Sequence, residues 1–218
     1  NMSTEKTGIS TKFIKSSNFI DDVYQSRKNI IKYLELEGYD CSDFNNFTLN
    51  DIHTMINTKQ LDILCENDNK ILVKYHLENT LRANVLYEYI EEFYNVDNVL
   101  NKDDNFVIVL YDKPNDTLIQ LLKSIWEQDG IFITIFSIKN TLFNILDHVM
   151  VPKHKKLNQE EKKNIMMKFN ITSEEEIPEI SRFDPVAIIL FLRPGELCEI
   201  TRYNKTSIIN IFYRICIS

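Results

Sequence analysis

The sequence predicts an α+β protein with an N-terminal α/β part and a smaller C-terminal α+β part. In roughly the first 145 residues, apolar side chains at helical spacing alternate with strand-length apolar runs, which is typical of helices layered on a sheet. Near the end, capped helix starts precede two runs that pair naturally as antiparallel strands. We expect a small α+β domain with a short mixed sheet there.

The boundary between the two parts is predicted near Pro152, which restricts Val151 to an extended backbone. The charge balance also changes sign there. Residues 151–218 carry 11 basic and 9 acidic side chains, and residues 1–150 carry 14 and 23, a balance of −9. We therefore expect a flexible lead-in over 1–16, an N-terminal domain over 17–148 and a C-terminal domain over 149–218.

In the N-terminal part, apolar spacing predicts a helix from about residue 19 to a cap at Gly38. Thr48 and Asp51 are placed as the capping pair of a second helix. The remaining expected elements are a hairpin over 59–65 and 70–77, a helix over 81–94, a strand over 106–111, a helix after residues 113–115 that ends at Gly130, and strands over 131–138 and 141–148, the last with a helix as the alternative.

In the C-terminal part, Asn158 is expected to cap a helix over 159–169, with Glu161 reaching back to it. Thr172 and Glu175 repeat this arrangement. Asp184 followed by Pro185 marks the start of another short helix. A turn at Gly195 then leads to strands over 196–202 and 208–217.

Composition and charge limit the classes of function. The chain has 218 residues, 44% of them hydrophobic, and a net charge of −7, so it does not match a protein that wraps DNA on its own. The longest apolar runs are strand-sized, which argues against a membrane partner. The four cysteines, Cys41, Cys65, Cys198 and Cys216, lack Cys-x-x-Cys spacing, so we expect reduced thiols and an intracellular protein.

A nuclease is the enzyme class to consider, because a helix, a hairpin and a helix-flanked sheet follow one another as in restriction-endonuclease-like layering. Such a site needs two carboxylates for a divalent metal and a nearby lysine. Asp62 and Lys74 are suitably placed, but Leu72 stands where the second acid is needed. The histidines lack metal-ligand spacing as well. We expect no catalytic site, metal or cofactor.

Several short signals follow one another in a fixed order over residues 151–218. They are Val151-Pro152-Lys153-His154, the helix start at 158–161, Ile177-Pro178-Glu179-Ile180, Asp184-Pro185-Val186-Ala187, Arg193-Pro194-Gly195-Glu196, Ile200-Thr201-Arg202, Thr206-Ser207 and Tyr213-Arg214-Ile215-Cys216. Their order and spacing resemble the C-terminal domain of the DNA-directed RNA polymerase subunit 5 family, which is shared by eukaryotic polymerases I, II and III and has an archaeal counterpart. Upstream, the similarity is in the order of elements.

The resemblance implies a non-catalytic subunit of a multisubunit DNA-dependent RNA polymerase. Its C-terminal domain would anchor on the largest subunit beside neighbouring small subunits, and its N-terminal domain would form part of the lower jaw near downstream duplex DNA. The implied partner-binding residues are Val151, Pro152, Lys153, His154, Arg193, Arg202, Tyr213 and Arg214, the arginines suiting bidentate pairs with carboxylates.

Two residues are implied to lie near DNA, Lys113 and Pro114, at a helix start whose positive dipole end suits a phosphate. Five others have structural roles: Asn158, Glu161, Asp184, Pro185 and Gly195.

The chain departs from the family pattern at two places. Phe191 stands where the family tends to have glycine, and residues 204–208 replace a Ser-x-Thr-x-Gly hairpin. These departures suit a viral or divergent eukaryotic member of the subunit 5 family. The expected location is the nucleus for a eukaryotic protein, and the cytoplasm or virion for an archaeal or viral one. The alternative functions are a stand-alone nucleic-acid-binding adaptor with a degenerate nuclease-like fold and an active nuclease.

Overall fold

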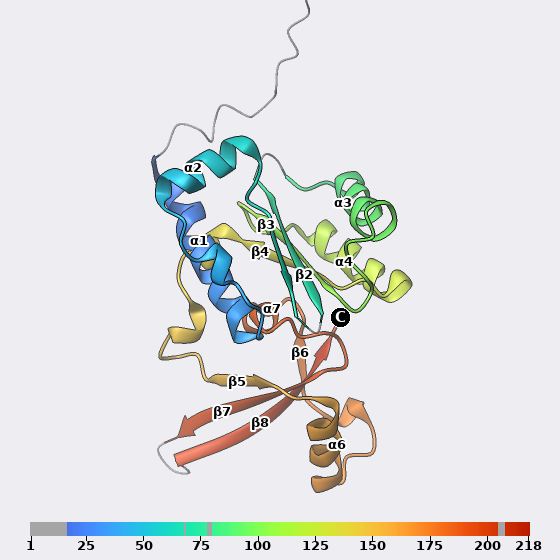
Figure 1. The fold of residues 1–218 in the computed structure, drawn as a ribbon. Helices are drawn as coiled ribbons and strands as arrows, with labels where there is room; N and C mark the ends of the chain where they lie inside the picture. The colour runs from blue at the N-terminus through green and yellow to red at the C-terminus, as the bar shows by residue number, and fades with distance from the viewer. Residues whose placement is uncertain (1–16, 68, 78–79, 205–207) are drawn as a thin grey trace, which may run out of the picture.

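The computed structural model describes residues 17–67, 69–77, 80–204 and 208–218 (Figure 1). The N-terminal elements are α1 (Ser17–Leu36), η1 (Ser42–Phe44), α2 (Leu49–Thr58), β1 (Ile63–Glu66), β2 (Lys70–His76), α3 (Ala83–Ile90), the π-helical η2 (Glu91–Val96), β3 (Asn105–Leu110), α4 (Asp116–Asp129), β4 (Ile133–Ser137), α5 (Ile138–Thr141) and η3 (Ile145–Asp147). The C-terminal elements are β5 (Lys153–Lys156), α6 (Gln159–Lys168), η4 (Glu174–Glu176), β6 (Glu179–Ser181), α7 (Pro185–Ile189), β7 (Leu197–Asn204) and β8 (Ile208–Ile217).

The N-terminal sheet has the strand order β1-β2-β3-β4. The first pair is antiparallel, as expected for the predicted hairpin, and the other two pairs are parallel. All residues of β4 are buried, as are all but the first residue of β3. Continuous burial is typical of parallel strands that helices cover on both faces.

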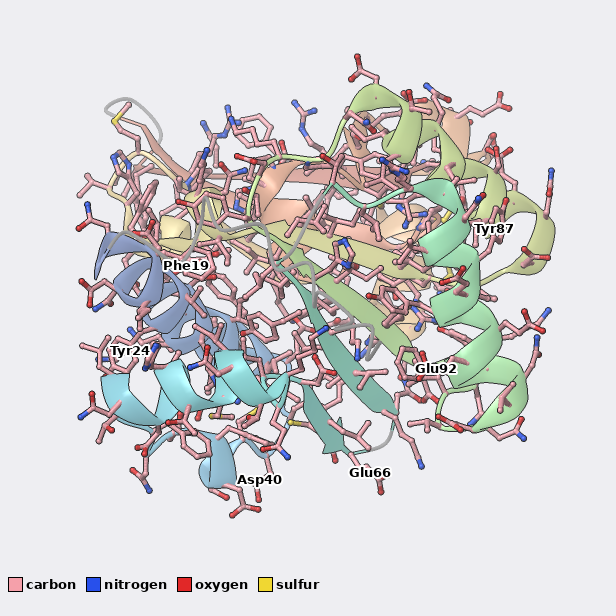
Figure 2. All side chains as sticks on the ribbon, turned by 90° about the horizontal axis from the view of Figure 1, so that it is seen from above. Phe19, Tyr24, Asp40, Glu66, Tyr87 and Glu92 are labelled. Atoms are coloured by element: carbon pink, nitrogen blue, oxygen red, sulfur yellow. The ribbon has the colours of Figure 1, made fainter. Side chains whose placement is uncertain are left out.

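Helices cover both faces of this sheet. Figure 2 shows Tyr24 of α1 and Tyr87 of α3 on opposite sides of the strands. On the α1 and α2 side, the core includes Ile30, Leu34, Ile52, Val73, Val107 and Val109. On the α3 and α4 side, it includes Leu86, Leu122, Phe106 and Ile108. Alternate residues of β3 thus enter opposite cores, and the predicted α+β class is confirmed.

Side-chain caps and glycines define the helix ends where the sequence predicts them. In α2, the Thr48 Oγ1 accepts a hydrogen bond from the Asp51 N–H at 3.4 Å, and the Asp51 carboxylate accepts one from the Thr48 N–H at 2.8 Å. Gly38 follows α1 with a φ of 89°, and Gly130 follows α4 with a φ of 69°. Both glycines occupy the left-handed backbone that ends many helices.

Two predictions for the N-terminal part need correction. Residues 141–148 form helical turns and not a strand, because Asn144 turns the chain locally: its Oδ1 accepts a hydrogen bond from the Leu146 N–H at 3.1 Å. Pro114 does not begin α4. Asn115 is the cap, with its side chain 2.8 Å from the Leu118 N–H, so Pro114 lies one residue before it.

The C-terminal sheet has the order β5-β7-β8-β6. The β5–β7 and β7–β8 pairs are antiparallel and the β6–β8 pair is parallel, so the predicted mixed sheet is confirmed. Its strands lie below the N-terminal layers in Figure 1, with α6 beside them.

The helix starts of the C-terminal part follow the predicted chemistry with one shift. Asn158 and Glu161 form the expected capping box of α6. Asp184 caps α7, with Pro185 in its first turn. The third box, however, joins Ser173 to Glu176 and not Thr172 to Glu175. The Glu176 carboxylate can reach back to Ser173 because only one 3-10 turn separates them. Gly195 has a φ of 88°, as a tight turn requires.

The two parts share apolar and polar contacts. Phe191, 1% exposed, belongs to the core beneath α1, and its ring lies 5.9 Å from that of Phe136 in β4. Arg182 is buried, donates from Nη2 to the Ile133 carbonyl at 2.7 Å and lies 4.8 Å above the Phe132 ring. The C-terminal part therefore packs directly on β4, the edge strand of the N-terminal sheet.

All four cysteines are buried free thiols, and the Cys41 and Cys65 sulfurs lie 3.4 Å apart. Within the described ranges, no group of three or more histidine, cysteine or acidic side chains is arranged to hold a metal ion. Among these residues, no helix has both the length and the hydropathy needed to cross a membrane.

Candidate partner-binding surface

The outer half of the β7–β8 strand pair presents uncovered apolar side chains. We call this region, residues 202–204 and 208–213, the arm. Figure 1 shows that it extends past the helices. Tyr203 and Ile208 are 70% and 75% exposed, respectively. The exposed apolar residues of the arm are Tyr203, Ile208, Ile209, Ile211 and Phe212.

Both faces of the arm carry exposed apolar side chains. Ile209 pairs with Tyr203 and Ile211 with Thr201, so these side chains share one face of the strand pair. Ile208 and Phe212 alternate with them and lie on the other face, together with the opposed pair Arg202 and Asn210. A sheet with one solvated face normally has polar residues on that face. In the arm, exposed apolar side chains occur on both faces, and grouped exposed apolar side chains mark interaction sites in soluble proteins.

One edge of the arm is also open. β6 pairs with β8 only through residues 215–217, and within the described part of the chain no strand continues this pairing along residues 208–214. An open edge offers backbone hydrogen-bonding groups to another chain. At its inner end, by contrast, the strand pair is packed: Leu197 and Ile215 are buried against α6.

Three of the predicted partner-binding residues lie on or next to the arm. Arg202 is exposed, with its guanidinium 5.4 Å from the Phe212 ring centroid. Tyr213 lies half-buried with its ring 5.8 Å from that of Phe169, and burial raises the pKa of its phenol. The Arg214 guanidinium donates from Nη1 to the Glu179 carbonyl at 2.7 Å, which orients it along β6.

The segment over Val151 to His154 leads into β5, at the edge of the same sheet. Val151 packs against the core beneath α7, and Lys153 is exposed. The His154 Nδ1 is 2.7 Å from the Pro152 carbonyl, so this nitrogen carries a proton. Burial lowers the pKa of His154, which favours the neutral imidazole at neutral pH.

Arg193 lies elsewhere and is engaged within the chain. Its Nη2 donates to the Asp104 carbonyl and the Asn105 side chain, each at 3.0 Å, and its guanidinium lies 5.2 Å from the Phe132 ring. The geometry thus gives no support to the prediction that Arg193 faces a partner carboxylate. Its donors instead join the C-terminal turn to the start of β3.

The two predicted DNA-proximal residues line a small cavity of about 170 Å³ at the carboxyl ends of β2 and β3. Lys113 is exposed, while the neighbouring Asp112 forms an ion pair with Lys139 at 2.6 Å. Pro114 lies between Lys113 and the α4 cap. Lys113 is therefore a surface cation next to a helix start, a position compatible with phosphate contact.

The suspected nuclease residues form an internal ion pair. The Lys74 Nζ lies 2.7 Å from one Asp62 oxygen, and the Tyr75 N–H donates to the other at 3.0 Å. Leu72 is buried in the core beneath α3 and α4. Asp62, just before β1, thus binds one side chain and one backbone N–H of β2.

Sequence reasoning missed the exposure of the arm and the burial of Arg182. The run Ile208-Ile209-Asn210-Ile211-Phe212 carries a signal for the former, because its apolar residues do not alternate with polar ones. No comparable signal distinguishes Arg182 from an exposed arginine, since its partners lie in β4 and in the loop before it.

The fold and the arm define a two-part α+β protein with an exposed apolar strand pair. Residues 143–216 match the family model for the RNA polymerase Rpb5 C-terminal domain. A DNA-directed RNA polymerase subunit Rpo5 of Thermococcus kodakarensis is 37% identical over 75 residues, which cover 34% of this chain and 90% of that protein. The chain belongs to the DNA-directed RNA polymerase subunit 5 family, as the order of motifs predicted.

Relatives also match outside the C-terminal part. Subunit 5B of DNA-directed RNA polymerases IV and V of Arabidopsis thaliana is 26% identical over 213 residues, covering 94% of this chain and 93% of that protein. Rpo5 of Pyrococcus abyssi is 39% identical over 75 residues, covering 34% of this chain and 90% of its own length. The similarity to the plant protein thus extends through the N-terminal part, where the family model has no match.

Proposed function

We propose that this chain is a non-catalytic structural subunit of a multisubunit DNA-dependent RNA polymerase. Its C-terminal domain, residues 149–218, anchors on the largest subunit next to small subunits, and its N-terminal domain, residues 17–148, forms part of the lower jaw near downstream DNA. Membership of the family supports the assignment to a polymerase. The observation that carries the anchoring role is the arm, which leaves apolar side chains uncovered on both faces.

The arm suits an extended or apolar segment of a large partner. Burial of its side chains would remove apolar area from water, which is the main favourable contribution to most stable protein interfaces. Arg202 and Lys153 lie at the rim of this surface and suit acidic partner residues. The layered N-terminal domain, whose arrangement we compare with restriction-endonuclease-like folds, would be held outward from the anchor. The cellular compartment would be that of the polymerase: nucleus, cytoplasm or virion.

Replacement of an arm residue tests the anchoring role. Ile211 is 51% exposed, so Ile211→Asp should leave the isolated chain folded and weaken its retention by the polymerase by about 2 kcal/mol, roughly 30-fold. Co-purification with the other polymerase subunits measures this loss. Leu64→Asp is the matched control, because Leu64 is a strand residue of the N-terminal sheet and is 40% exposed.

Retention of Ile211→Asp at the wild-type level would contradict anchoring through the arm. Binding of the purified chain to free duplex DNA at physiological salt, with no polymerase subunit co-purifying, would favour the stand-alone adaptor instead.

Charge reversal at Lys113 tests the proximity to DNA. In the assembled polymerase, Lys113→Glu should weaken retention of downstream duplex DNA and reduce the salt dependence of that retention by about one ionic contact. Lys102→Glu is the matched control, because Lys102 lies in the loop before β3, at the opposite end of the strand. An unchanged salt dependence in Lys113→Glu would contradict a phosphate contact.

A further inference from the structure

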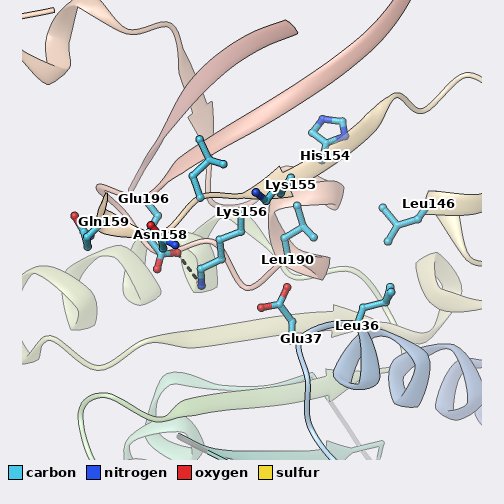
Figure 3. Close-up of a pocket in the computed structure, with 11 residues that line it drawn as sticks. Leu36, Glu37, Leu146, His154, Lys155, Lys156, Asn158, Gln159, Leu190 and Glu196 are labelled. Carbon is cyan, nitrogen blue, oxygen red and sulfur yellow. Dashed lines mark ion pairs between the residues drawn. The ribbon is translucent and has the colours of Figure 1, made fainter. Parts of the chain in front are cut away.

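A second open surface lies between the end of α1 and the C-terminal sheet. It is a groove of about 630 Å³, and the lining residues that matter here are Leu36, Glu37, Leu146, Lys156, Leu190 and Glu196. Figure 3 shows the Glu37 carboxylate directed into the space beneath Leu190 and beside Lys156. The groove therefore has aliphatic walls and a charged floor.

The floor contains Lys156 and the carboxylates of Glu37 and Glu196, and Lys156 pairs with only one of them. The Lys156 Nζ forms an ion pair with Glu196 at 3.0 Å, and Glu196 also accepts a hydrogen bond from the Arg193 N–H at 2.8 Å. Among the residues that the structure describes, none forms a hydrogen bond or ion pair with the Glu37 side chain. Lys156 is thus paired with Glu196, and the Glu37 side chain is left without a direct hydrogen-bond or ion-pair partner in the described part of the chain.

Burial is the largest influence on the Glu37 carboxyl and raises its pKa; Lys156 lowers the pKa and Glu196 raises it. The other basic residues of the lining do not neutralise it. Lys155 pairs with Glu161 at 2.6 Å, and burial favours the neutral form of His154. A carboxylate that has lost part of its water without gaining a partner is poised to accept a cation.

We propose that this groove receives a lysine or arginine side chain, with an adjacent aliphatic side chain, from a neighbouring polymerase subunit. This inference rests on the proposed function. The cation would pair with Glu37, and the aliphatic side chain would lie against Leu36, Leu146 and Leu190. Leu36 is 63% exposed, which leaves apolar area for a partner to cover. Charge complementarity selects this occupant, since Lys156 pairs with Glu196 and Lys155 with Glu161, which leaves Glu37 without an ion-pair partner among the described residues.

Photo-crosslinking in the assembled polymerase tests the proposal. A photo-crosslinking amino acid in place of Leu36 should attach to another polymerase subunit, in a peptide that contains lysine or arginine. Addition of Glu37→Lys should lower the crosslink yield at least about tenfold, because like charges would then meet in the groove. Glu88→Gln, an exposed site on α3, should leave the yield unchanged.

The variant Glu37→Gln distinguishes loss of contact from failure to fold, because it keeps the side-chain shape and removes only the partly buried charge. This variant should retain the folded state and still lower the crosslink yield. Absence of any crosslink from Leu36 to another subunit, attachment to a second copy of this chain, or a yield that Glu37→Lys leaves unchanged would each overturn the inference. If Ile211→Asp still releases the chain from the polymerase, the proposed function remains supported.

Discussion

At the residue scale, Phe191 combines a strained backbone with a large buried ring. Its φ of 46° lies in the left-handed region, which costs an L-residue roughly 1–2 kcal/mol. Its side chain is 1% exposed and packs on Phe136. The position where the family tends to have glycine thus keeps a backbone suited to glycine, and burial of the ring offsets the strain.

This combination predicts an unusual order of stabilities. Phe191→Ala should lower the free energy of unfolding by about 3–5 kcal/mol, since it removes a core ring. Phe191→Gly should cost about 1 kcal/mol less than Phe191→Ala, because glycine adopts a positive φ without strain. Denaturant unfolding of the isolated chain measures both. Phe106, which is buried and has no positive φ, is the control position where alanine should be the better tolerated of the two. The same order at both positions would contradict backbone strain at Phe191.

At the element scale, α6 depends on its first turn. Its hydrophobic side chains contact the core only at Ile165 and Met166, so the capping box and Lys162 supply much of its attachment. Lys162 is buried and donates to the Gly195 carbonyl at 2.7 Å, which ties α6 to the turn before β7.

Removal of the cap should therefore loosen this helix. Asn158→Ala should lower the free energy of unfolding by about 1 kcal/mol, because the Glu161 N–H loses its 2.8 Å acceptor. Asn164→Ala, within the same helix and exposed, should change stability little or increase it, since alanine favours helix interiors. Chemical denaturation with both variants measures the difference. Equal stability of the two variants would show that the box contributes nothing.

At the scale of the whole molecule, acidic groups have opposite effects on the pH dependence of folding. The pKa values of Asp51, Glu161 and Glu176 are lowered, and side-chain hydrogen bonds are the largest cause for each of them. The stability that these groups contribute is present above their ordinary pKa values and is lost as pH falls through their folded values. Glu37 behaves in the opposite way, because burial raises its pKa from the ordinary 4.5. Its contribution is present below pH 4.5 and is lost as pH rises through the folded value.

Comparison of Glu37→Gln with the unaltered chain isolates this effect. The two should be equally stable well below pH 4.5, where the carboxyl is protonated in both the folded and unfolded states. As pH rises toward neutrality, Glu37→Gln should become the more stable one. Thermal or denaturant unfolding across this pH range measures the difference. A constant difference at all pH values would show that ionisation of Glu37 is not its cause. Greater stability of the isolated variant, combined with weaker contact in the polymerase, would identify Glu37 as a residue kept for binding.

Much of the fold could be predicted because its determinants are local. The caps at Thr48, Asn158 and Asp184 use side chains within three residues of the groups that they satisfy. The hairpin and the β7–β8 pair follow from neighbouring runs of sequence. Local signals failed where two readings were nearly equivalent, as in residues 141–148, whose apolar spacing suits either a strand or a short helix.

The candidate binding residues could be predicted only in part. Their order along residues 151–218 indicated the family, and the comparisons confirmed it. The sequence could not distinguish Arg193 from Arg202. Arg193 donates to the backbone of Asp104, which is distant in the sequence, whereas Arg202 faces solvent, and local patterns do not indicate such a distant contact.

The sequence by itself thus determined most of the helices and the longer strands, the caps at Thr48, Asn158 and Asp184, and the family. Tertiary structure alone decided which apolar side chains remain uncovered on the arm and which carboxylate lacks a partner in the groove. The physical reason is the range of the interactions. Capping and alternation act over a few residues, whereas burial and charge compensation depend on residues that folding brings together from distant segments, such as Glu37 and Lys156.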